Sequence, residues 1–340
     1  MFLSNKKNFF VIAEIGHNHM GKLDVAYKMI ETAKRCGADA VKLQKRDNKS
    51  LYTKKFYNSL YDNANSYGLT YGKHREYLEF NHNQYKLLQK FAKKIGIFLF
   101  ATPFDFASVK FLKKLNMPGY KIASADLINT PLQREIAKTG KPIILSTGGG
   151  NFKDIDRAVK NILKINKNLT VLHCTASYPA DYKDMNLLVI KKLKQKYKKL
   201  TIGLSDHENG IDAGVVAYML GARVFEKHFT LNRGQKGTDH AFSLEPVGLE
   251  KFIRNLNRVD ILMGSGNKKV LDSEKKPLYK MQKSIVAAKD LNKGHKIVLN
   301  DLSYKSPADG LEPYKTNLVV GKKLKKDLKK DDYILKNNLK

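Results

Sequence analysis

The sequence predicts an α/β protein that consists of a (β/α)₈ TIM barrel followed by a small β-rich domain. Eight short runs of β-branched or aromatic residues alternate with stretches of helical period, which is typical of repeated βα units around a parallel sheet. Polar side chains lie at the end of nearly every run, and a different pattern begins near residue 283. The 340 residues exceed the about 250 residues of a barrel by enough for a second domain.

The predicted strands are separated by stretches that are long enough for a helix after each one. They cover residues 10–15, 40–44, 97–101, 120–122, 143–146, 170–174, 201–204 and 224–227. In the first intervening stretch, apolar residues recur at the spacing of one helical face. These residues are Leu23, Ala26, Met29, Ile30 and Ala33. The alternation of strands and helices therefore continues from the start of the chain.

The polar residues at the ends of the predicted strands are of types that bind ions or react. They are Glu14, Lys42, Gln44, Thr102, Lys121, Ser124, Ser146, Thr147, Tyr178, Ser205, His207 and His228. A closed barrel brings the carboxyl ends of its strands to one mouth, where the active sites of this fold lie. The shared position of these residues favours a closed barrel over an open sheet and predicts an active site at that mouth.

Three lysines, Lys42, Lys121 and Lys227, lie at or near strand ends and close to several of these hydroxyl groups. Ammonium groups neutralise phosphate and carboxylate, while hydroxyls and backbone amides orient them, so we expect an anionic substrate. A lysine in a barrel also serves Schiff-base aldolases, and imine formation is the chemical alternative. That alternative leaves the two histidines unexplained.

His207 and His228 follow the seventh and eighth strands, which are expected to be neighbours about 4.8 Å apart. Two imidazoles at this place can bind one divalent cation and leave coordination positions open for water and substrate. Glu14 ends the first strand, where a carboxylate can orient water or exchange a proton. The structural alternatives are a histidine that only packs and a Glu14 that only pairs with a lysine.

The net charge of +31 raises the question of nucleic-acid binding. The excess is nearly all scattered lysine without a nucleic-acid-binding motif, so we expect a solvated surface that also attracts anionic small molecules. No apolar run reaches the about 18 residues that cross a membrane, and the amino terminus lacks a signal-peptide cleavage site. Cys36 and Cys174 show no CxxC spacing. These observations predict a cytoplasmic protein with no nucleic-acid partner and no membrane partner.

Two segments depart from the repeated βα pattern. Residues 45–81 form a long insertion rich in Tyr and Asn, which we expect to be a lid or a dimer contact, with disorder as the alternative. Residues 266–282 are polar and are expected to link a barrel of residues 1–265 to a domain of residues 283–340. In that domain KDLNKGHKIVLNDL, from Lys289, recurs in degraded form as KDLKKDDYILKNNL, from Lys326. The repeat predicts short strands with internal pseudo-symmetry.

Nine motifs follow one another along the chain: AEIGHNHMG, VKLQ, ATPFD, YKIAS, LSTGG, HCTASYP, GLSDH, EKHFTL and GTDHAFSLEP. In sequence and in order they resemble the motifs of the sialic acid (N-acylneuraminate, or nonulosonate) synthases. SIVAAKDLNKGHKI and DLSYKSPADGL resemble the C-terminal antifreeze-like (SAF) domain of that family. The resemblance covers nearly the whole chain and implies a domain-swapped homodimer in which the SAF domain covers the partner's barrel.

The resemblance also implies a reaction. Phosphoenolpyruvate would condense with an N-acyl amino-hexose aldehyde to give a sialic-acid-type 3-deoxy-nonulosonate and phosphate. The aldehyde would be N-acetylmannosamine or a related deoxy or diacylamino sugar. Glu14 would be the catalytic carboxylate, and His207 and His228 would bind manganese or magnesium. The residues implied to contact substrate are Lys42, Thr102, Lys121, Ser124 and Ser205 for phosphoenolpyruvate, and Gln44, Tyr178 and Asp239 for the sugar. Ser146, among the hydroxyls at the strand ends, is also expected to bind substrate.

Two positions depart from the pattern of the family. Ala176 stands where bacterial N-acetylneuraminate synthases have Asn, and Ser306, followed by Pro307, stands where many have Arg. Both positions concern sugar recognition, so we expect a deoxygenated or differently acylated hexose rather than simple N-acetylmannosamine. Another 3-deoxy-ulosonate synthase is an alternative among enzymes, and a sugar- or polyanion-binding barrel is the alternative outside them. The intact set of Glu, Lys and His favours an enzyme.

Overall fold

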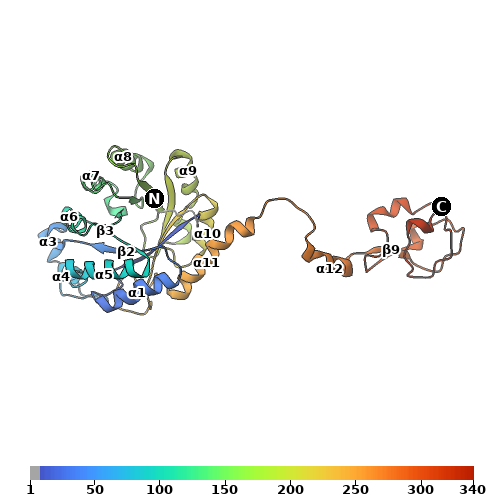
Figure 1. Cartoon of the computed structure of the whole chain (residues 1–340), viewed down its shortest axis with the longest axis horizontal. Helices are drawn as coiled ribbons and strands as arrows, with labels where there is room; N and C mark the ends of the chain where they lie inside the picture. Colours follow the sequence, from blue (N-terminus) through green and yellow to red (C-terminus); the bar gives the residue numbers. More distant parts are fainter. Residues whose placement is uncertain (1–7) are drawn as a thin grey trace. The chain divides into compact units, whose positions relative to one another are not determined.

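The computed structural model describes residues 8–340 and shows a closed barrel and a separate smaller unit. The chain divides into two compact units, one that ends at Met263 and one that runs from Gly264 to Lys340. In the first unit, eight parallel strands pair in sequence order, and the last strand pairs with the first. Helices surround this barrel (Figure 1). The predicted (β/α)₈ fold is therefore confirmed.

The strands lie where the sequence pattern predicts them. They are β1 Phe10–Gly16, β2 Ala40–Lys45, β3 Phe98–Pro103, β4 Tyr120–Ile122, β5 Ile143–Ser146, β6 Leu169–Cys174, β7 Thr201–Asp206 and β8 Val224–His228. The largest differences occur at the carboxyl ends of β3 and β7, each of which continues for two more residues. The apolar run stops there, but the backbone ladder continues because β3 pairs with β2 and β7 with β8.

Helices follow the strands around the outside of the barrel. They are α1 Leu23–Arg35, α5 His82–Ile95, α6 Phe106–Lys114, α7 Thr130–Ala137, α8 Phe152–Leu163, α9 Leu188–Lys196, α10 Asp212–Met219 and α11 Pro246–Met263. Asn81 and Asn151 begin α5 and α8 with capping boxes, which satisfy backbone N–H groups of the first turn. None of the helices between residues 8 and 340 is long and apolar enough to span a membrane.

The interior of the barrel changes from apolar to polar along the strands. Side chains point inward at every second position of a strand. Near the amino ends these positions form an apolar cluster: Phe10, Ile12, Ala40, Phe100, Ile144, Leu172 and Val224. Two residues further along, the same positions hold Glu14, Lys42, Thr102, Ser146, Cys174 and Glu226. The apolar layer closes the lower end of the barrel, so the polar groups above it share one mouth.

The insertion after β2 is folded, so the alternative of disorder is wrong. It contains the short helices α2 Asn48–Leu51, α3 Lys54–Tyr57 and α4 Tyr71–Tyr77. The ring of Tyr71 lies 4.6 Å from that of Phe56 and 5.3 Å from that of Tyr61, which forms a small aromatic core. Tyr67 and Asn65 hydrogen-bond to the backbone of the loop that follows β8. The insertion is therefore attached to the mouth of the barrel.

The smaller unit contains a helix and a compact domain with few strands. The helix, α12 Asp272–Met281, lies within the segment predicted as a linker. The strands are β9 Ser284–Ala287 and β10 Leu302–Lys305, which pair antiparallel. The rest of the domain is held by isolated bridges and short 3₁₀ turns around its own apolar core. The domain thus has less regular strand than the sequence pattern suggests.

The internal repeat of this domain is visible in its hydrogen bonds. The backbone N–H of Lys293 donates to the carboxylate of Asp327, at 2.6 Å, and that of Lys330 donates to Asp290, at 2.8 Å. Leu291 and Leu328 exchange both backbone hydrogen bonds. Each pair joins a residue of the first copy of the repeat to a residue of the second, so the two copies contact each other reciprocally.

Candidate active site

A cavity of about 690 Å³ lies at the carboxyl ends of the barrel strands. It is lined by the residues that the sequence analysis assigned to the site, with the exception of Thr147 and Lys227. The lining residues among them are Glu14, Lys42, Gln44, Thr102, Lys121, Ser124, Ser146, Tyr178, Ser205, His207, His228 and Asp239. They come from all eight strands or from the loops that follow them, because a closed barrel directs all its strand ends to one mouth.

The floor of the cavity holds two lysines that are each paired with a carboxylate. Lys42 Nζ lies 2.8 Å from Glu14 Oε2, and Lys121 Nζ lies 3.2 Å from Glu226 Oε1. All four side chains are at least 95% buried. Burial opposes the ionisation of Glu226, but Lys121 and Lys42 outweigh burial and lower the pKa of Glu226 to about 2. The floor therefore carries charges of both signs that balance.

Hydroxyl groups surround these ion pairs. Thr102 Oγ1 accepts a hydrogen bond of 2.8 Å from Lys42, and Ser205 Oγ donates one of 3.3 Å to Glu226. Ser124 Oγ accepts from the backbone N–H of Gly148 at 3.0 Å. Gly148 begins a glycine-rich loop, residues 148–150, that also lines the cavity. Ammonium groups, hydroxyls and this loop thus meet in one region, a combination that suits a phosphate or carboxylate.

Glu14 lies between the floor and the wall of the cavity. Its Oε2 pairs with Lys42, and its Oε1 accepts a hydrogen bond of 2.7 Å from Gln44 Nε2. Gly16 follows with φ of +54°, and a Cβ atom there would lie 3.3 Å from both Glu14 Oε1 and Gln44 Nε2. Glycine therefore lets the chain turn close to the carboxylate without crowding it.

His207 and His228 face each other, with ring centroids 5.3 Å apart. His207 Nδ1 lies 2.8 Å from the carbonyl oxygen of Thr175. Burial, with a contribution from His228, lowers the pKa of His207 to about 3, so its ring is neutral. Nδ1 then donates to Thr175, and Nε2 keeps a free lone pair. His228 Nδ1 is buried without a hydrogen-bond partner.

This histidine pair fits a divalent cation. Neutral imidazoles whose other nitrogen donates to a carbonyl are typical metal ligands, and His207 meets that description. Asp239 Oδ2 lies 3.7 Å from His228 Nδ1. Within residues 8–340, no three His, Cys, Asp or Glu side chains are grouped so that they could hold a metal. Water and substrate oxygens would therefore complete the coordination.

Lys227 does not reach the cavity, so its predicted part in anion binding is wrong. It lies between Glu226 and His228, which face inward, and therefore points to the opposite side of β8. Its ammonium group is buried behind the barrel wall, 2.7 Å from Asp206 Oδ2 and 2.6 Å from the carbonyl oxygen of Glu208. This ion pair supports the wall.

The wall of the cavity includes residues implied in sugar recognition. Tyr178 lies against His207, with ring centroids 4.2 Å apart, and Ala176 lines the cavity beside it. Ser306 belongs to the smaller unit, where its Oγ donates to the carbonyl oxygen of Met281 and accepts from Lys283 Nζ.

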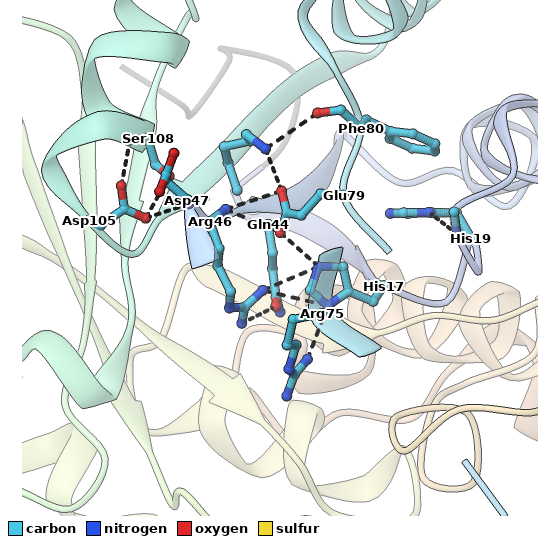
Figure 2. A network of polar contacts seen from close by, with 12 residues as sticks. His17, His19, Gln44, Arg46, Asp47, Arg75, Glu79, Phe80, Asp105 and Ser108 are labelled. Carbon is cyan, nitrogen blue, oxygen red and sulfur yellow. Dashed lines mark hydrogen bonds and ion pairs between the residues drawn. The ribbon is translucent and has the colours of Figure 1, made fainter. Parts of the chain in front are cut away.

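The sequence analysis missed two arginines that line the same cavity, Arg46 and Arg75. His17 lies between them, 3.2 Å from Arg46 and 3.3 Å from Arg75 (Figure 2). Arg46 also donates a hydrogen bond of 2.7 Å to Gln44 Oε1. Burial and both arginines lower the pKa of His17 well below its usual value, so His17 is neutral. Together the arginines extend the site beyond Gln44.

Comparison with known proteins agrees with this architecture. The NeuB family matches residues 29–268 and the SAF domain matches residues 282–340. N-acetylneuraminate-9-phosphate synthase of Mus musculus is 38% identical over 99% of this chain and 94% of its own length. N,N'-diacetyllegionaminic acid synthase of Campylobacter jejuni is 38% identical over 96% of this chain and 99% of its own.

A solved structure is also similar. The N-acetylneuraminic acid (sialic acid) synthetase from Leptospira borgpetersenii superposes with a TM-score of 0.70 at 32% identity, over 82% of this chain and 94% of its own. The family match covers most of the chain, and the relatives match almost from end to end. The chain therefore belongs to the NeuB family, which it shares with synthases of sialic acid and related nonulosonic acids, and it ends in a SAF domain.

Proposed function

We propose that this chain condenses phosphoenolpyruvate with an N-acyl amino-hexose aldehyde and releases a 3-deoxy-nonulosonate and phosphate. The observation that carries the proposal is the floor of the cavity, where two buried lysine–carboxylate pairs lie among hydroxyl groups. Beside them lie the neutral imidazole of His207 and the imidazole of His228, whose Nδ1 has no hydrogen-bond partner. The names of the relatives support the same reaction class. We place the reaction in the cytoplasm, where the two free cysteines stay reduced.

The floor would bind phosphoenolpyruvate. Lys42 and Lys121 would exchange part of their contact with Glu14 and Glu226 for the phosphate and carboxylate oxygens of the substrate. Hydroxyl groups would donate further hydrogen bonds; these come from Thr102, Ser124, Ser146 and Ser205. The binding site would thus be formed before the substrate arrives and would need only a change of hydrogen-bond partners.

The histidine pair would serve the second substrate. His207 and His228 would hold manganese or magnesium, which polarises the aldehyde carbonyl when bound. Thr175 fixes the tautomer of His207 through its carbonyl oxygen. Gln44, Tyr178 and Asp239 would hold the rest of the sugar at the wall of the cavity.

Glu14 would direct the steps that follow. The methylene carbon of phosphoenolpyruvate would form a bond to the aldehyde carbon, while the π bond of the aldehyde breaks and its oxygen takes up a proton to become a hydroxyl group, and positive charge would develop at carbon 2. Glu14, held by Lys42 and Gln44, would orient the water that attacks carbon 2 and accept its proton. The resulting hemiketal phosphate then loses phosphate through cleavage of its C–O bond, which leaves the keto acid.

Imine formation is the second candidate chemistry, and Lys121 is the residue that would carry it. Burial lowers the pKa of Lys121, which is the direction that a nucleophilic lysine needs. Its ion pair with Glu226 favours the ammonium form instead. An adduct trapped at Lys121 with borohydride would support this alternative.

The fate of the bridging oxygen tests the proposed reaction. We expect that phosphoenolpyruvate labelled with ¹⁸O at the bridging position gives labelled phosphate and an unlabelled nonulosonate, because the bond from carbon 2 to oxygen breaks. Mass spectrometry of both products, with a panel of amino-sugar aldehydes, provides the measurement. Label retained in the nonulosonate would rule the mechanism out.

We further propose that the SAF domain completes the site of a partner chain in a domain-swapped homodimer. A chain that ends near Ser273 should keep a folded barrel, because the two units have separate apolar cores. We expect this truncation to raise the KM for the aldehyde or to abolish turnover. Light scattering and steady-state kinetics provide the measurement, and a fully active monomer of the whole chain would contradict the proposal.

A further inference from the structure

The two histidines of the proposed metal site differ in how their backbone is held. His228 ends β8, and its carbonyl oxygen accepts a hydrogen bond of 2.8 Å from the backbone N–H of Leu244. It also has a register partner, Glu14, on β1. His207 follows β7 and lies one residue beyond the last position at which that strand pairs with β8. The strand ladder thus fixes His228, whereas the position of His207 depends on the loop that carries it.

Lys227 holds the chain on both sides of His207. Its Nζ lies 2.7 Å from Oδ2 of Asp206, the residue before His207, and 2.6 Å from the carbonyl oxygen of Glu208, the residue after it. The carboxylate of Glu208 also lies nearby, with Oε1 3.9 Å from Nζ. Lys227 itself immediately precedes His228. One ammonium group therefore joins the segment that carries His207 to the strand that ends in His228.

These contacts are shielded from water. Lys227, Asp206 and Glu208 are each at most 2% exposed. Oδ1 of Asp206 accepts a further hydrogen bond of 2.9 Å from the backbone N–H of Glu208, so one carboxylate joins the turn to the ammonium group. A hydrogen bond that involves charged groups is stronger than a neutral one, and a low dielectric strengthens it further. This set of contacts, here called the lysine bridge, therefore holds residues 206–208 in one arrangement.

Stability alone does not explain the lysine bridge. The desolvation of buried charges offsets most of their attraction, so a buried ion pair adds little net stability compared with apolar residues of similar volume. Asp206 and Lys227 are register partners on β7 and β8, and the residue that follows each of them is one of the two histidines. The bridge therefore lies where it can set the distance between the two imidazoles.

Resting on the proposed function, we infer that Lys227 is a positioning residue of the metal site and that it acts through the turn at Asp206 and Glu208. The two imidazole rings are 5.3 Å apart between centroids, and ligation requires both nitrogen atoms to lie within about 0.2 Å of their ideal distances from the ion. A shift of the turn would displace His207 while His228 stayed on its strand. Groups that orient metal ligands in this way change metal affinity by about 10- to 100-fold.

Binding of Mn²⁺ to the whole chain, measured by calorimetry without substrates, tests the inference. We expect Lys227→Met to weaken this binding by about 10-fold or more, because the turn that carries His207 loses its connection to β8. Excess Mn²⁺ should restore turnover, with the midpoint of the metal titration shifted by the same factor, because mass action compensates for a weaker site. A residue that only stabilised the barrel would lower the melting temperature without shifting this midpoint.

A second variant separates positioning from folding. Lys227→Met alone leaves the carboxylate of Asp206 buried without its cation, which is strongly destabilising. The double variant Lys227→Met and Asp206→Asn removes both charges and keeps the approximate size of both side chains. We expect it to melt closer to the unaltered protein than the single variant does, but to bind Mn²⁺ as weakly as the single variant.

Lys45→Met is the matched control. Lys45 ends β2, its side chain is 11% exposed, and its Nζ lies 2.6 Å from Glu79 Oε2, so it also forms a largely buried ion pair at a strand end. It does not line the cavity and is adjacent in sequence to neither histidine. We expect this variant to lose thermal stability and to keep the Mn²⁺ affinity of the unaltered protein.

Three outcomes would overturn the inference and leave the proposed metal site intact. In the first, Lys227→Met folds and binds Mn²⁺ as tightly as the unaltered protein. In the second, the double variant regains the affinity together with the melting temperature, and in the third, Lys45→Met weakens the binding equally. If the unaltered chain binds no Mn²⁺, or if His207→Ala and His228→Ala leave the affinity unchanged, the proposed metal site itself fails and the inference fails with it.

Discussion

Turnover is expected to be lost when both imidazoles are removed in the double variant His207→Ala and His228→Ala, and when divalent cations are chelated from the unaltered protein. The structure leaves His228 Nδ1 buried without a partner and fixes His207 with a free Nε2. A metal held there would contribute several kcal/mol of charge stabilisation, and about 4 kcal/mol corresponds to about a thousandfold in rate.

The measurement is the initial rate after exhaustive chelation, followed by stepwise addition of Mn²⁺ or Mg²⁺ and determination of the metal content. His82→Ala, at the amino end of α5, removes a histidine that does not line the cavity and serves as the control. We expect the control to keep its activity and its metal. Rates that survive chelation, or a double variant that turns over normally, would show that the histidine pair has another purpose.

The second large effect is expected from Glu14→Gln. The substitution keeps the size of the side chain but removes the charge beside Lys42, 2.8 Å away. Without a carboxylate to orient water and accept its proton, kcat should fall by about 10²- to 10⁴-fold. The KM values should change much less, because the other contacts to both substrates remain.

Steady-state kinetics with both substrates separate this role from a structural one. A purely structural Glu14 would lower the melting temperature, since its loss leaves Lys42 buried with a weaker partner, but would not lower kcat selectively. Glu250→Gln, on the exposed side of α11, is the control for loss of a carboxylate. A decrease in kcat of less than tenfold would refute the assignment of Glu14 as the catalytic carboxylate.

The barrel and most of the lining of its cavity follow from local patterns in the sequence. A parallel barrel directs the carboxyl end of each strand to one mouth, so a polar residue at a strand end can be placed without knowledge of its neighbours. Glu14 lies in the first strand and His228 in the last, far apart in the sequence, yet they pair across β1 and β8. Closure of the barrel supplies that contact.

The errors have specific physical causes. Lys227 was placed in the cavity and Glu226 was overlooked, because side chains alternate along a strand and a shift of one residue exchanges the two faces. Arg46 follows Lys42 and Gln44 at intervals of two, so the period of the strand could have revealed it. Arg75 lies on α4, within the insertion, and no local pattern connects that helix to the cavity.

The smaller domain shows a different limit of sequence patterns. Its repeat was recognisable, but few residues are in strands, because isolated bridges and 3₁₀ turns connect the two copies. Side-chain carboxylates such as Asp290 and Asp327 take over hydrogen bonds that a longer ladder would supply. A pattern of apolar residues indicates which residues enter the core, and it does not say which partner satisfies the backbone.

The lysine–carboxylate pairs of the floor and Arg75 lie on different parts of the fold, and this difference bears on how such an enzyme changes during evolution. The residues of the floor stand on barrel strands, where the backbone of each strand is fixed by two neighbours, so mutations there disturb the scaffold as well as the chemistry. Arg75 stands on a helix of the insertion, outside the barrel ladder. Loop-borne segments tolerate insertion and replacement. Lineages descended from one ancestral barrel could therefore acquire new sugars by exchanging this segment while they inherit the condensation unchanged.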